Sequence, residues 1–101
     1  MSFIEQIVVN NELLSIRVEE WNEDIYFYPF TLDDNDWIQK KANGQDGAFI
    51  AYFLIRKCLD KDGKKLFTVA DKLTLTKSCD SDLLTRIMLE MRGEKVDYEG
   101  N

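Results

Sequence analysis

The sequence contains no histidine, the side chain that most often serves as a general base or binds a transition metal. Its two cysteines, Cys58 and Cys79, lack the paired spacing of a metal or disulfide framework. Cys58 follows an apolar stretch with no imidazole to lower its pKa, so we interpret it as a small buried hydrophobe. The carboxylate of Asp80 opposes activation of Cys79. We therefore expect a protein-binding function, with no enzymatic activity, no cofactor and no metal site.

Long apolar runs and an excess of basic residues are also missing. The longest apolar run, Ala48 to Ile55, falls short of the roughly 20 residues that span a bilayer. The net charge of −6 disfavours contact with nucleic acid and anionic lipid. The N-terminus has neither the basic nor the long apolar region of a signal peptide. We expect a cytoplasmic protein whose partners are proteins, with no nucleic acid and no membrane among them.

The chain has 101 residues, of which 45% are hydrophobic, and these values suit one folded domain. We expect that domain to cover residues 1–93 and the polar residues 94–101 to form a flexible tail. Ser2 and Glu5 have the spacing of a capping box and predict a short N-terminal helix. The β-branched pair Val8-Val9 leaves a strand open as the alternative.

A β-hairpin is the clearest local prediction. In Leu14–Val18 apolar residues alternate with polar ones, which is the period of a half-buried strand. Asn22-Glu23-Asp24 interrupts this pattern as a turn, and Ile25–Tyr28 is rich in strand-favouring residues. Within that second strand we expect the aliphatic and phenylalanine side chains on one face and the tyrosines on the other.

The rest of the chain predicts helices. They are a helix from Thr31 to Asn43-Gly44, a buried central helix from about Asp46 to Leu59, a short helix opened by Thr68 and Asp71, and a last helix capped by Asp80 or Ser78 and ended by Gly93. The expected fold class is α+β, mainly α, with an N-terminal β-hairpin packed on a bundle of about four short helices.

Five side chains are candidates for a protein-binding surface: Trp21, Tyr26, Tyr28, Met88 and Met91. Tyrosine and tryptophan are enriched in interfaces because each joins a large apolar body to a polar tip. The alternative for the aromatic residues is that they cover the domain's own helices. The two methionines lie in the apolar stripe of the last helix, which is core in most proteins, and would suit an adaptable surface only if exposed.

Three segments together resemble a known family. They are Ile16–Trp21, which ends in a Glu-Trp pair, Ile25–Thr31, which leads into an acidic helix start, and Cys58–Thr68, in which Asp-Gly is followed by Leu-Phe and a capping Thr. Their order and spacing resemble the tail assembly chaperones of long-tailed, siphovirus-type bacteriophages and prophages. The resemblance covers roughly residues 1–92.

This resemblance implies a function. Such chaperones bind the tape measure protein and keep it soluble while the tail tube assembles, with the major tail protein as a further expected partner. It also implies self-association, a location in the host cytoplasm and absence from the mature virion. Two alternatives remain: a head-tail joining or tail-terminator protein that stays in the virion, and a small acidic inhibitor of a host protein.

Overall fold

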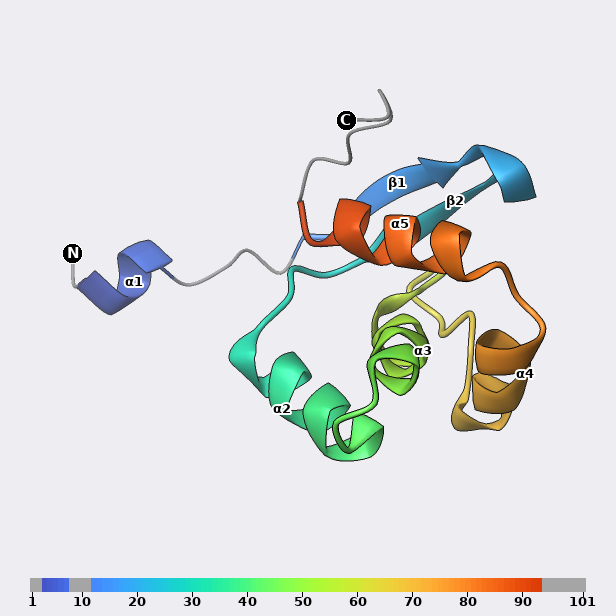
Figure 1. Ribbon diagram of the computed structural model, residues 1–101. Coiled ribbons are helices and arrows are strands. Elements are labelled where there is room, and N and C mark those ends of the chain that lie inside the picture. The colour runs from blue at the N-terminus through green and yellow to red at the C-terminus, as the bar shows by residue number, and fades with distance from the viewer. Residues whose placement is uncertain (1–2, 8–11, 94–101) are drawn as a thin grey trace, which may run out of the picture.

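The predicted hairpin is present in the computed structural model, which describes residues 3–7 and 12–93 (Figure 1). Strand β1 (Leu14–Val18) pairs antiparallel with β2 (Glu23–Phe27), and Ile16 lies opposite Ile25. Ile25 and Phe27 face the core, so the predicted division of the second strand into two faces is confirmed on its apolar side.

The predicted position of the hairpin turn is wrong. The strands are joined by a 3-10 turn, η1 (Glu19–Trp21), and by Asn22, while Glu23 and Asp24 already belong to β2. Asn22 takes a left-handed conformation with φ 53°, which asparagine tolerates better than most residues. Asp24 is held in the strand by an ion pair of 3.2 Å with Arg17 of β1, a cross-strand contact that the turn prediction did not consider.

Within residues 3–7 and 12–93 the structure has five α-helices: α1 (Phe3–Ile7), α2 (Leu32–Ala42), α3 (Asp46–Lys57), α4 (Lys72–Lys77, preceded by the 3-10 turn η2, Val69–Asp71) and α5 (Ser81–Met91). Asp80 is the N-cap of α5, and its carboxylate accepts a hydrogen bond from the backbone N of Asp82. Of the two predicted caps, Asp80 and Ser78, the structure therefore selects Asp80. Gly93, at φ +79°, follows the last helix as predicted.

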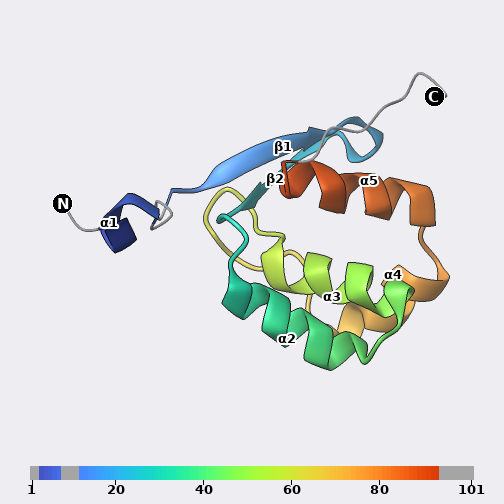
Figure 2. The same ribbon diagram turned by 60° about the vertical axis from the view of Figure 1, so that its left-hand side comes forward.

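Helix α3 is the centre of the helical layer, and the expected fold class is confirmed. It packs against α2, α4 and α5, and α5 lies between α3 and the hairpin (Figures 1 and 2). Both views place α1 beyond the end of the hairpin, away from the other helices. The main buried side chains come from every packed element: Val18, Ile25, Phe27, Ile38, Phe53, Leu54, Leu75, Leu84 and Ile87.

The central helix ends two residues earlier than predicted. Cys58 is extended, and Leu59 exchanges two backbone hydrogen bonds with Tyr26 of β2, with N to O distances of 2.9 and 2.8 Å. The Nζ of Lys65 donates to the carbonyl oxygens of Ile55 and Arg56, where a cation complements the helix dipole. Tertiary pairing therefore overrides the helical pattern of the sequence at this point.

A buried carboxylate joins α2 to α3. Asp34 accepts hydrogen bonds from the backbone N of Thr31 at 2.9 Å, from Arg56 Nε at 2.7 Å and from Lys57 Nζ at 2.8 Å. Lys57 also donates to the carbonyl oxygen of Pro29 at 3.2 Å. Burial alone would raise the pKa of Asp34, but the bonds from Lys57, Arg56 and Thr31 outweigh it and lower the pKa from 3.8 to about 2.

Three expectations receive no test or only a partial one. Residues 94–101 lie outside the described part of the chain, so the flexible tail and the single-domain boundary at residue 93 stay predictions. The N-terminal helix is confirmed over Phe3–Ile7, whereas Ser2 and Val8-Val9 lie outside the described residues.

Within residues 3–7 and 12–93, no helix has the length and apolar character that crossing a membrane requires.

The ion cluster predicts a pH-dependent stability. The lowered pKa of Asp34 means that its stabilising effect is present above the unfolded carboxyl's pKa of about 4 and is lost as pH falls toward 2. Asp34→Asn should lower the free energy of unfolding by about 3 kcal/mol at neutral pH, because Lys57 stays buried without its counter-charge. Denaturant titrations between pH 2 and 7 measure both effects.

Asp33→Asn is the matched control. Asp33 also pairs with Arg56, at 3.1 Å, but its carboxylate is exposed, so its loss should change the unfolding free energy by less than about 1 kcal/mol. Equal losses in the two variants would show that burial of the Asp34 carboxylate does not matter.

Candidate functional site

An open hollow of about 550 Å³ lies between the hairpin and the segment that follows α3. We call it the β2 groove. Its apolar lining consists of Trp21, Ile25, Tyr26, Leu66 and Phe67, and its charged lining of Arg17, Glu23, Asp24, Asp60, Lys61 and Asp62. Segments from two distant parts of the chain therefore form one surface that carries both apolar, mainly aromatic, side chains and charged ones.

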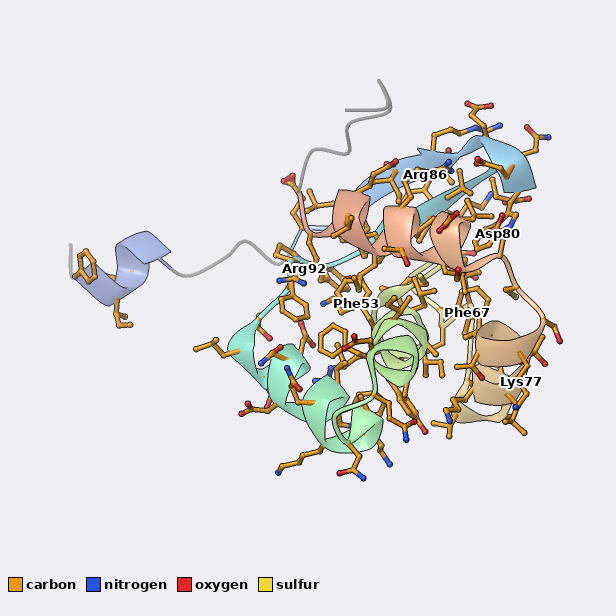
Figure 3. All side chains as sticks on the ribbon, in the orientation of Figure 1. Phe53, Phe67, Lys77, Asp80, Arg86 and Arg92 are labelled. Carbon is orange, nitrogen blue, oxygen red and sulfur yellow. The ribbon has the colours of Figure 1, made fainter. Side chains whose placement is uncertain are left out.

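Trp21 and Phe67 form an aromatic wall of the groove, and its position depends on the η1 turn, in which Trp21 is the last residue. Trp21 packs edge-on against Phe67, with ring centroids 6.4 Å apart, so each ring covers part of the other. Its neighbour Glu20 accepts two hydrogen bonds from the guanidinium of Arg86 on α5, and these bonds lower the pKa of Glu20. Figure 3 labels Arg86 on α5 and Phe67 in the segment before α4. The last helix thus fixes one side of the groove.

The opposite wall is a tight turn built on Asp60. Its carboxylate accepts hydrogen bonds from the backbone N of Asp62 at 2.8 Å and of Lys64 at 2.9 Å, and these bonds lower the pKa of Asp60. Gly63 has φ +80°, a conformation that L side chains rarely adopt. The turn therefore favours the charged form of Asp60 and places Asp62 in the lining of the groove.

Two of the predicted site residues meet in the groove and a third lies beside it. Trp21 and Tyr26 both line it and are half-buried. Tyr28 lies just after β2, is 37% exposed and lines a neighbouring hollow together with Leu59 and Lys65. The aromatic residues of the hairpin thus pack in part against the segment that follows α3, and in part they are exposed to solvent.

Met88 and Met91 do not belong to an exposed surface. They are 7% and 6% exposed and lie in the hydrophobic core, where Cys58 Sγ lies 3.8 Å from Met91 Sδ. Nearby at the end of α5, the Arg92 guanidinium lies 5.3 Å from the ring centroid of Phe30 (Figure 3). The side of α5 that carries the two methionines faces α3 and the hairpin. We expected them to bind a partner only if they were exposed, and in this fold they are buried.

Leu66 and Phe67 are groove residues that we did not predict as site residues. Leu66 is 42% exposed and Phe67 is half-buried against Trp21. A signal was available, because this apolar pair directly follows the polar turn and precedes the capping Thr68, with no helical or strand pattern to require burial. Their contact with the hairpin rests on the pairing of Leu59 with Tyr26, for which the sequence carries no signal.

The comparisons with known proteins include a similar solved structure. No family model and no curated protein sequence matches the chain. Among solved structures, that of the bacteriophage HK97 tail assembly chaperone matches with a TM-score of 0.67 and 10% sequence identity, covering 95% of this chain and 93% of the other. The two chains share one fold. At this identity the likeness establishes the architecture, and at the level of the fold it agrees with the resemblance to tail assembly chaperones found in the sequence.

The two cysteines differ sharply in their surroundings. Cys58 is fully buried, and burial raises the pKa of its thiol to about 12, although Lys65 acts in the opposite direction. Cys79 is exposed just before α5. The interpretation of Cys58 as a buried hydrophobe is confirmed.

Thiol labelling tests this arrangement. At neutral pH the native protein should react rapidly with a thiol reagent through Cys79 alone, because the Cys58 thiolate is neither accessible nor populated. In denaturant both thiols should react. The Cys79→Ser variant isolates Cys58, and rapid labelling of that variant in its native state would show that α5 opens readily from the core.

Proposed function

We propose that the chain is a phage tail assembly chaperone that binds the tape measure protein and keeps it soluble while the tail tube forms. The observation that carries this proposal is the fold shared with the HK97 tail assembly chaperone over nearly the whole of both chains. The order of the segments Ile16–Trp21, Ile25–Thr31 and Cys58–Thr68 supports it independently. The function is one of binding, without a catalytic step.

The β2 groove is the proposed client site. It offers partly exposed apolar side chains, including Leu66 and Tyr26, on a protein whose net charge of −6 keeps it soluble. Apolar burial contributes roughly 25 cal/mol per Å², so one such groove binds a client segment weakly and reversibly. Weak contacts at many copies along a long client add up through avidity, and self-association of the chaperone would supply those copies.

The place of action follows from this role. We propose that the protein works in the host cytoplasm, that it contacts the tape measure protein and in turn the major tail protein, and that it is absent from the mature virion. A head-tail joining or tail-terminator protein would instead remain in purified particles, where mass spectrometry detects it.

Co-expression with the tape measure protein tests the proposal. A tag on this chain should recover soluble tape measure protein, and omission of this chain should leave the tape measure protein in the insoluble fraction. Leu66→Glu should reduce recovery several-fold, because it places a charge in the apolar part of the groove.

Leu73→Glu is the matched control. Leu73 lies on α4, is 61% exposed and does not line the β2 groove, so its replacement should leave recovery unchanged. Circular dichroism and the denaturation midpoint of both variants establish that they are folded. Recovery that is independent of this chain would overturn the chaperone proposal, whereas equal loss in both leucine variants would overturn the assignment of the groove.

A further inference from the structure

The outer edge of β2 has an interrupted hydrogen-bonding pattern. Both backbone groups of Tyr26 point away from β1 and bond to Leu59. Because residues two apart on a strand direct their backbone groups to the same side, the N–H and C=O of Asp24 point the same way. Among residues 12–93, no backbone group bonds to those two outward groups of Asp24.

The pairing stops because the partner segment turns away. After Leu59 the chain enters the Asp60 turn, in which the N–H of Asp60 donates to the Lys64 carbonyl and its C=O accepts from Gly63. Asp24 and the residues of this turn both line the β2 groove, so the groove adjoins the strand edge at Asp24. An unpaired strand edge beside a groove that holds apolar side chains is an arrangement by which proteins bind extended peptides as an added strand.

The charge around this edge selects the occupant. The groove lining contains the four carboxylates Glu23, Asp24, Asp60 and Asp62 but only two basic side chains, Arg17 and Lys61. Arg17 is already engaged with Asp24 and Glu19. The excess negative charge therefore favours a segment that carries lysine or arginine beside its apolar residues.

We propose that an extended, basic and apolar segment of the client adds to β2 at Asp24, antiparallel to β2, and continues the ladder that Leu59 begins. One apolar side chain of the segment packs among Trp21, Tyr26 and Leu66, and a neighbouring basic side chain pairs with Asp62. This inference rests on the proposed chaperone function and adds to it the kind of segment that is recognised and how its backbone is held.

The probe is a short synthetic peptide in which lysine alternates with valine around a central phenylalanine, titrated into the full chain by calorimetry. Two isomers carry N-methyl groups, one on every lysine amide and the other on every apolar amide. In an extended peptide these two sets of N–H groups point to opposite edges. Strand addition predicts that one isomer binds like the parent and that the other loses at least about fivefold in affinity. Equal affinities of the two isomers would overturn strand addition.

Charge and position are tested on the protein side. Asp62→Lys should weaken binding of the basic peptide about threefold, and a peptide with glutamate in place of lysine should bind the unaltered protein more weakly than the basic one. Leu66→Ala should weaken the basic peptide, and Leu73→Ala should not. A peptide that binds the Leu66→Ala variant unchanged would be using another surface, such as the β1 side of the hairpin, and would overturn the proposal.

Failure of this inference and failure of the proposed function give different results. If the two methylated isomers bind alike while recovery of the tape measure protein still depends on Leu66, strand addition is wrong and the chaperone function stands. If the isomers differ as expected but the tape measure protein is not recovered, the groove binds basic extended segments of a different protein.

Discussion

The carboxylate of Asp34 is the contact on which the relative positions of the other elements depend. It caps α2 through Thr31 and at the same time neutralises Arg56 and Lys57 at the C-terminal end of α3. A buried ion pair adds little net stability over a well-packed apolar pair, but losing one partner is costly because the other charge is then buried alone. The cluster therefore holds the C-terminal end of α3 against the start of α2.

The end of α3 in turn determines the candidate site. Helix α3 ends at Lys57, and two residues later Leu59 pairs with Tyr26 in place of a further helical turn. That pairing brings the Asp60 turn and the Leu66-Phe67 pair beside the hairpin and leaves the edge of β2 open at Asp24. On the other side, α5 holds the η1 turn through Arg86 and Glu20. Packing of the helices is thus linked directly to the shape of the groove.

Local signals in the sequence were sufficient for most of the fold. The alternation in Leu14–Val18 and the caps at Thr31 and Asp80 identify elements through short-range chemistry, and all three are present. The site was predicted only in part. Trp21 and Tyr26 stand out by residue type, whereas Leu66 lies in the groove because of the long-range pairing of Leu59 with Tyr26. The turn at Asn22 and the end of α3 were misplaced for the same reason: cross-strand contacts decide them.

The central claim is that the β2 groove contacts the tape measure protein during assembly. Site-specific photo-crosslinking tests it most directly, with a photo-reactive amino acid placed at position 66 in the groove or at position 73 on α4, in cells that also make the tape measure protein. The account predicts a crosslinked adduct with the tape measure protein from position 66 and none from position 73. Adducts from position 73 alone, or in equal yield from both positions, would contradict it.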